Sequence, residues 1–204
     1  MRDIIIVNKD DNGRLTMVFY PGTTVERKAG VSGKQFLNGL FMGNSGIMMQ
    51  QLNELTGIKT PTVQNWVSRG FLQRPVNKRY SKNATARIFI INALRNVMTL
   101  EDIKKLLIFV NGNPENPVDD IIPESRLYGY FCEIIENENF SFKRVNQLID
   151  QLLTSYEEKL SHAKERLRIA LEIICINFLA NELFTRSQAL IATIEQKNIF
   201  GECM

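Results

Sequence analysis

The chain has 204 residues, the size of one domain or of one small domain with a helical extension. Apolar residues make up 44% of it, charged residues 23% and aromatic residues 9%, and there are only 6 prolines. This is the composition of an ordinary globular protein, and it excludes collagen-like, low-complexity and disordered classes. The net charge of +3 is too small to identify a partner by itself.

The cysteines and the apolar stretches favour a cytoplasmic protein. Cys132, Cys175 and Cys203 are odd in number and far apart, which fits neither a disulfide framework nor a zinc site. We expect reduced thiols, with Cys132 and Cys175 buried, and we expect no metal and no cofactor. The first residues lack the apolar run of a signal peptide, and the most apolar stretch, residues 169–180, is too short to cross a bilayer. No membrane association is expected.

The charges are distributed unevenly along the chain. Residues 1–56 carry 6 basic and 5 acidic side chains, residues 57–110 carry 10 and 2, and residues 111–204 carry 9 and 15. Within the middle part, residues 57–100 contain no carboxylate at all. Such a window predicts a surface that binds a polyanion, although a solvated basic face is an alternative. Its basic residues are Lys59, Arg69, Arg74, Lys78, Arg79, Lys82, Arg87 and Arg95.

We expect the first segment, residues 1–44, to contain a β-hairpin and a short helix. Ile4–Val7 and Leu15–Phe19 flank a loop whose Asn-Gly pair supplies the positive φ angles of a tight turn. Pro21-Gly22 closes the hairpin. A short apolar helix is expected over residues 36–41.

The second segment, residues 45–110, begins with two short predicted helices. Ser45 is the expected N-cap of the first, which ends at Gly57. Thr60 caps the second, with Pro61 at its first position, and Gly70 ends it. Two short helices joined by a tight turn that contains glycine form a helix-turn-helix.

The second of these helices is amphipathic and presents side chains suited to DNA. Val63, Trp66 and Val67 share one face, and polar residues occupy the rest. Gln64 and Asn65 can each form two hydrogen bonds to adenine, and Arg69 can reach a phosphate.

A basic extended stretch follows over residues 71–80, and its Pro75 and Asn77 favour a turn, as a β-wing would. Ser81 caps a third helix that runs to about Val97, and Thr99 opens a fourth that runs to residue 110. The predicted DNA contacts from the second helix and the wing are Lys59, Thr60, Thr62, Gln64, Asn65, Ser68, Arg69, Arg74, Asn77, Lys78, Arg79 and Tyr80.

Two stretches of this segment carry a family resemblance, GIKTPTVQNWVSRGFL and RYSKNATARIFIINALRNVMTLEDIKKLL. They resemble the recognition helix, the wing end and the next two helices of the MerR family of winged-helix bacterial regulators. The matching residues are Gly57, Ile58, Thr62, Trp66, Gly70, Phe71, Leu72, Tyr80, Ser81 and 99–103.

The sequence also departs from that family at the base-reading positions. Gln64, Asn65 and Ser68 stand where the family commonly has Arg, Tyr and a basic residue, so its base preference does not transfer. Residues 30–140 resemble more closely an uncharacterised bacterial MerR-like group, the domain of unknown function numbered 1836. This resemblance implies DNA binding and no known ligand.

The third segment, residues 111–204, is predicted to be helical. After a turn-rich linker over residues 112–117, we expect a helix over Pro123–Glu138 and a long helix that starts near Ser141. Apolar residues recur along the long helix at near-heptad spacing, which predicts a partner helix. The MerR resemblance implies a dimer, and an intramolecular hairpin in a monomer is the alternative. The expected dimerisation residues are Phe142, Val145, Ile149, Leu152, Tyr156, Leu160, Leu167 and Ile174, and Ala163 and Ala170 share the seam.

Together these patterns predict a mainly α protein: a MerR-like winged helix-turn-helix with an N-terminal β-hairpin and a C-terminal dimerisation region. The expected function is sequence-specific binding of double-stranded DNA by a homodimeric transcriptional regulator, whose effector the sequence does not identify. An enzyme is not expected, because the only histidine, His162, lies in a charged stretch and no nucleophile motif accompanies it. The alternative is a winged-helix protein-interaction adaptor that does not bind DNA.

Overall fold

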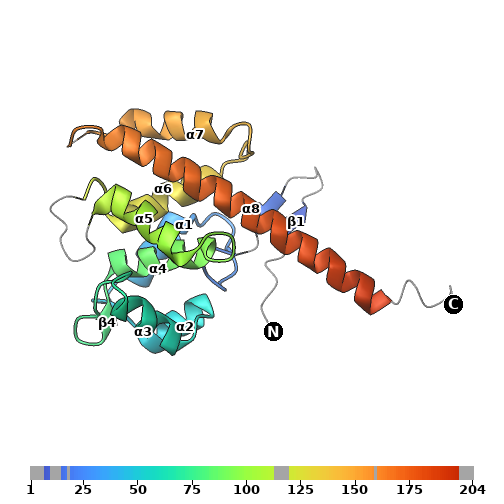
Figure 1. The fold of residues 1–204 in the computed structure, drawn as a ribbon, viewed down its shortest axis with the longest axis horizontal. Helices are drawn as coiled ribbons and strands as arrows, with labels where there is room; N and C mark the ends of the chain where they lie inside the picture. The colour runs from blue at the N-terminus through green and yellow to red at the C-terminus, as the bar shows by residue number, and fades with distance from the viewer. Residues whose placement is uncertain (1–6, 10–14, 18, 113–119, 159, 198–204) are drawn as a thin grey trace.

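The structure is a computed structural model that describes residues 7–9, 15–17, 19–112, 120–158 and 160–197. It is mainly helical, with two small antiparallel sheets and a long C-terminal helix, as the sequence predicts (Figure 1). No helix among these residues is both long enough and apolar enough to span a bilayer.

The first segment contains the predicted hairpin. β1 (Val7–Lys9) and β2 (Leu15–Met17) pair antiparallel, and Val7 lies opposite Met17. The expected strand residues 4–6 and the Asn-Gly turn lie outside the described residues. α1 (Gly33–Leu40) starts earlier than predicted because Ser32 and Gln35 form a capping box, in which each side chain accepts a hydrogen bond from the other residue's backbone N–H.

The loop between the hairpin and α1 is held against a later helix at Gly22. Its φ is +71°, and a Cβ at this position would lie 1.9 Å from the carbonyl oxygen of Phe89. The Gly22 carbonyl accepts a hydrogen bond of 2.9 Å from the Asn92 side chain. Only glycine fits so close to the neighbouring backbone, so the Pro21-Gly22 pair joins the first segment to the core.

The next elements are β3 (Ile47–Met48), α2 (Met49–Thr56), α3 (Thr60–Ser68) and β4 (Arg79–Tyr80), and β3 pairs antiparallel with β4. The prediction of Ser45 as an N-cap was wrong, because pairing with β4 keeps β3 extended and α2 starts only at Met49. Thr60 is the first residue of α3 rather than its cap, and Lys59 holds the N-cap position. The predicted helix end at Gly57 is confirmed, with a left-handed φ of +67°.

Two capped helices follow. Ser81 and Thr99 accept hydrogen bonds from the backbone N–H groups of Ala84 and Asp102, at the starts of α4 (Lys82–Leu94) and α5 (Leu100–Asn111). Both N-caps were predicted. α4 ends before Val97, and it is buried on every side from Ala84 to Ile91.

The C-terminal half differs from the prediction. It consists of α6 (Glu124–Ile135), α7 (Val145–Leu152), the 3₁₀ helix η2 (Leu153–Ser155) and α8 (Ala163–Lys197). The prediction of a single long helix over residues 141–174 was wrong. The chain leaves the helix after η2, and His162 has a positive φ of 59° just before α8 begins.

Because the helix is interrupted between η2 and α8, the two halves of the apolar seam lie on separate helices, and α7 packs against α8. Of the expected dimerisation residues, Val145, Ile149, Tyr156, Leu167 and Ile174 are buried in the protein's own core, Leu152 is half-buried, and only Phe142 and Leu160 are exposed. Side chains that cover one another within the chain give no ground for a dimer interface. The intramolecular helical hairpin, the alternative to that interface, accounts for the seam.

The core is continuous across the segment boundaries expected at residues 44 and 110. A chain of aromatic contacts crosses it from the N-terminal loop to α8, with ring centroids between 4.1 and 6.3 Å apart. The predicted burial of Cys132 and Cys175 is confirmed. The aromatic chain runs through Tyr20, Phe36, Phe89, Tyr128, Phe131 and Phe178.

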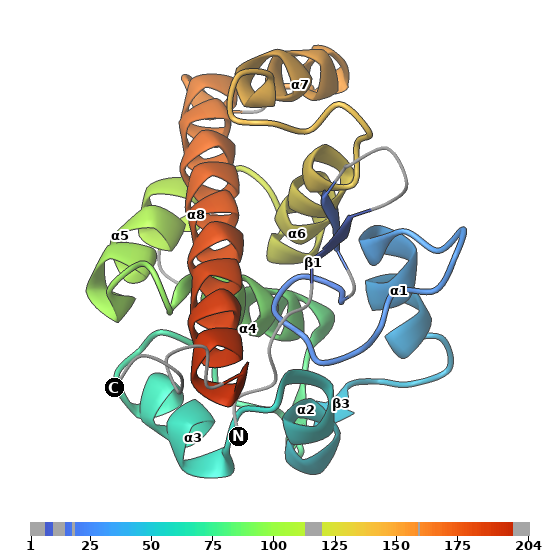
Figure 2. The ribbon, with the colours of Figure 1, turned by 90° about the vertical axis from the view of Figure 1, so that its right-hand side faces the viewer.

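Seen from two sides, the α2–α3 pair and α7 lie at opposite ends of the body (Figures 1 and 2). α8 crosses the body, and its C-terminal half extends beyond the other helices (Figure 1). The outer face of α3 and the distal part of α8 thus lie at the periphery of the body.

Candidate nucleic-acid interface

α3 separates its apolar and polar residues as the sequence predicts. Val63 and Trp66 are buried in the core. Gln64, Asn65 and Ser68 are exposed, and Thr62 is half-buried. The side chains expected to read bases therefore reach solvent, while the aromatic side of the helix anchors it.

Hydrogen bonds fix α3 at both ends. At its start, the Thr60 hydroxyl and the Asn53 side chain of α2 are hydrogen-bonded at 2.7 Å. After its end, the Arg87 Nε donates a 2.8 Å hydrogen bond to the carbonyl oxygen of Phe71, which is itself buried. A helix held in this way presents its outer face with little freedom to tilt.

A two-residue turn projects beside α3. Val76 and Arg79 exchange backbone hydrogen bonds of 3.0 and 2.9 Å, and Asn77 and Lys78 between them have positive φ values of 49° and 61°. Positive φ at both central residues defines a type I′ hairpin turn, which Asn tolerates well. Arg74, Val76, Asn77 and Lys78 are exposed, so the predicted turn is present and its tip carries exposed basic side chains.

Two predicted phosphate contacts already have partners in the free protein. The Arg69 guanidinium lies 2.5 Å from the Glu101 carboxylate of α5, and both side chains are solvent-accessible. Arg79 is half-buried, and its Nη1 donates a 2.9 Å hydrogen bond to the Gly46 carbonyl next to β3. The exposed side chains of Lys59, Arg74 and Lys78 are therefore better placed to meet a phosphate than Arg79 is.

Two residues of the basic window do not lie on this surface. Tyr80, predicted to contact DNA, is only 2% exposed, and burial raises the pKa of its hydroxyl. Arg87 is also 2% exposed, and its Nη1 lies 2.9 Å from the Glu124 carboxylate of α6. The prediction that these two residues lie on a DNA-binding surface was therefore wrong, because β4 and α4 point their side chains into the core.

An open cleft of about 410 Å³ runs along α3 on the side of the α4–α5 turn. The Arg95 guanidinium stands at this cleft, 6.0 Å from the centroid of the Trp66 ring. The cleft therefore combines apolar walls with amide, hydroxyl and guanidinium groups. Its lining residues are Pro61, Thr62, Asn65, Trp66, Arg95 and Leu100.

Sequence reasoning missed Glu101 and Glu124, because each lies more than thirty residues from the arginine it meets. One signal for Glu124 was available. The run from Ala84 to Ile91 is apolar on all faces, which indicates a buried helix, and an arginine inside such a helix needs a carboxylate partner.

Among the described residues, no three His, Cys, Asp or Glu side chains gather where they could hold a metal ion.

Comparison with known families locates this surface within a recognised domain. Residues 41–131 match the family model described as Domain of unknown function (DUF1836). The match begins ahead of β3, includes α3 and the turn over residues 76–79, and ends in α6, so the DUF1836 region contains the whole candidate interface. It confirms the predicted resemblance to that family and states no activity. No curated protein and no solved structure matches the chain.

Proposed function

We propose that this protein is a cytoplasmic, sequence-specific DNA-binding transcriptional regulator that acts as a homodimer. The observation that carries the proposal is the exposed face of α3. It offers Gln64, Asn65 and Ser68 to solvent and holds no carboxylate, next to the exposed cations of the wing turn. Amide side chains that can form paired hydrogen bonds to bases, flanked by cations for phosphates, are the chemistry of direct readout.

In this proposal the α2–α3 pair is a helix-turn-helix and the turn over residues 76–79 is its wing, as in the MerR-like resemblance. α3 enters the major groove, where Gln64 and Asn65 contact base edges. Arg74 and Lys78 of the wing meet the sugar-phosphate backbone. The open cleft beside α3 places the Arg95 guanidinium where it would meet that backbone.

The test is duplex binding measured by fluorescence anisotropy as a function of salt, after selection of the best site from random DNA. With about four phosphate contacts per protomer, a dimer should give a log-log salt slope near −7. A curve that stays flat between 50 and about 300 mM salt would contradict DNA binding and leave the adaptor function.

Two substitutions separate the roles of base reader and phosphate contact. Gln64→Ala should cost about 1 to 3 kcal/mol on the selected site and little on random DNA. Lys78→Ala should weaken both equally and reduce the salt slope by about one unit per protomer. Equal losses on both DNAs for Gln64→Ala would show that this residue does not read bases.

The homodimer is proposed to form through α8 rather than through the seam predicted from sequence. The outward side of α8 carries residues spaced alternately by four and three, the period of a coiled coil. We call this the α8 stripe, and its members are Ile169, Ile173, Ile176, Ala180, Leu183, Ser187, Leu190 and Ile194.

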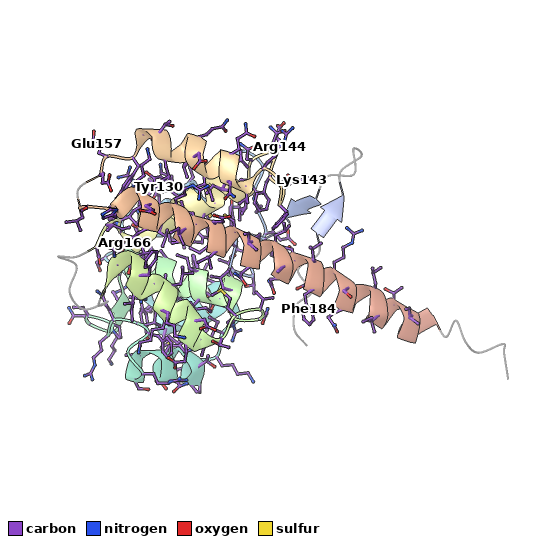
Figure 3. The ribbon with its side chains drawn as sticks, turned by 45° about the horizontal axis from the view of Figure 1, so that its top comes forward. Tyr130, Lys143, Arg144, Glu157, Arg166 and Phe184 are labelled. Atoms are coloured by element: carbon purple, nitrogen blue, oxygen red, sulfur yellow. The ribbon has the colours of Figure 1, made fainter. Side chains whose placement is uncertain are left out.

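The distal half of the α8 stripe is exposed. Leu183 is 55% exposed, Leu190 60% and Ile194 46%, and Phe184, 53% exposed, lies beside them on the projecting part of the helix (Figure 3). So large an apolar surface in water favours association. A second copy of α8 fits it best, because a coiled coil needs a second helix with the same repeat and a second copy supplies one.

Leu190→Glu should weaken the dimer at least about 100-fold, since it would bury an unpaired carboxylate in each of the two helices. Gln188→Glu introduces the same charge at an exposed position off the stripe, and it should leave the dimer intact. Light scattering distinguishes the outcomes. Wild-type protein at micromolar concentration should have twice the monomer mass of 23.4 kDa, and a monomeric wild type would overturn the dimer.

A further inference from the structure

The fold pairs one carboxylate with an arginine at the end of α3. Glu101 follows the acid-free window directly in sequence, in the first turn of α5, and its Oε1 lies 2.5 Å from the Nη2 of Arg69. Their side chains are 58% and 46% exposed. This ion pair therefore lies in water, at the C-terminal end of the proposed recognition helix.

Neighbouring groups hold the Arg69 side chain in place. Its guanidinium carbon is 5.0 Å from the centroid of the Phe71 ring, which the core fixes. The Lys104 ammonium is also 5.0 Å from that ring and donates a 3.3 Å hydrogen bond to the Arg69 carbonyl oxygen. Arg69 is thus held beside the proposed DNA face with its charge offset by Glu101.

We propose that Glu101 lowers the affinity of this protein for DNA by competing with a backbone phosphate for Arg69. The inference rests on the proposed function and identifies a residue that sets its strength. A carboxylate and a phosphate accept hydrogen bonds from the same guanidinium N–H groups, so Arg69 cannot serve both fully. While the pair with Glu101 is intact, Arg69 leaves that phosphate without a partner, and the loss of affinity is limited to the strength of an exposed ion pair.

Glu101 acts on the phosphate contact and not on base reading. It lies on α5, and the side chains proposed to read bases, Gln64 and Asn65, lie on α3. It therefore lowers the affinity for every duplex by a similar factor. Loose binding to arbitrary sequences is suppressed, so that stable complexes depend on the base contacts.

The test is Glu101→Gln, measured by anisotropy on the selected duplex and on a random duplex. Affinity for both should rise about threefold to fivefold at low salt, the range of an exposed ion pair. The salt slope should steepen by about one unit per protomer, because Arg69 then neutralises a phosphate. The gain should disappear when Glu101→Gln is combined with Arg69→Ala, since Glu101 acts through that side chain.

Asp150→Asn is the matched control. It breaks an exposed ion pair of the same kind, 2.8 Å between Asp150 and Arg168, but on α7 at the opposite end of the body from α3. DNA affinity should not change.

The outcomes separate this inference from the proposed function. If wild-type protein binds DNA with a steep salt slope and Glu101→Gln leaves the affinity unchanged or lowers it, Glu101 is not a competitor and the inference fails alone. A gain that persists in the Arg69→Ala background also overturns it. Absence of DNA binding by wild type and by every variant overturns both.

Discussion

Replacing Glu124 with alanine is expected to lower the free energy of unfolding by about 3 to 5 kcal/mol. The substitution leaves the Arg87 charge in the core without its carboxylate, and Arg87 is only 2% exposed. Its Nη2 already has no hydrogen-bond partner in the described part of the chain, so no spare acceptor can take over. Burial lowers the pKa of Arg87, and the neighbouring Glu124 carboxylate opposes that shift because it stabilises the charged guanidinium.

Urea denaturation checks this expectation, with Glu133→Ala as the control. Glu133 is an exposed carboxylate on the same helix, α6, so its loss should change stability by less than about 0.5 kcal/mol. Replacing both members of the pair, Arg87→Met with Glu124→Met, should restore most of the loss, because the double variant leaves no buried charge. A loss below about 1 kcal/mol for Glu124→Ala would mean that water reaches Arg87 when its partner is removed.

The second large effect is a pH-dependent one at Glu182 of α8. This residue is 5% exposed, and neither carboxylate oxygen has a hydrogen-bond partner in the described residues. Burial raises its pKa from the usual 4.5 to about 7. Below pH 4.5 the carboxyl group is neutral in both the folded and the unfolded chain, so it has no effect on stability there.

As the pH rises from 4.5 to 7, the unfolded chain releases this proton and the folded chain keeps it, so stability falls over that window and stays low above it. Glu182→Gln cannot ionise. The variant should be more stable than wild type by up to about 3 kcal/mol at pH 8, and the difference should vanish near pH 4.

Urea denaturation at a fixed protein concentration, across this pH range, measures the difference. Glu165→Gln removes an exposed charge from the same helix and controls for the change in net charge. If the stability difference between Glu182→Gln and wild type were the same at pH 4 and pH 8, Glu182 would not be a buried, unpaired acid.

The sequence by itself determined the elements whose causes are local. The side-chain caps at Ser81 and Thr99 start α4 and α5, and the left-handed Gly57 ends α2, because each rests on hydrogen bonds or φ angles within a few residues. The face of α3 was predictable too. Val63 and Trp66 recur at helical spacing, so the residues between them must face outward.

The tertiary structure alone decided what lies against each surface. The spacing from Phe142 to Ile174 shows that an apolar stripe must be covered, but one helix against a second chain and two helices folded together satisfy it equally well. The partners of charged side chains were likewise decided by the tertiary structure. Glu101 reaches Arg69 and Glu124 reaches Arg87 only because α5 and α6 pack where they do. Apolar periodicity shows that a helix face must be covered, and a buried charge shows that an opposite charge must lie nearby. Only the packing of distant segments determines which helix covers the face and which residue carries the opposite charge.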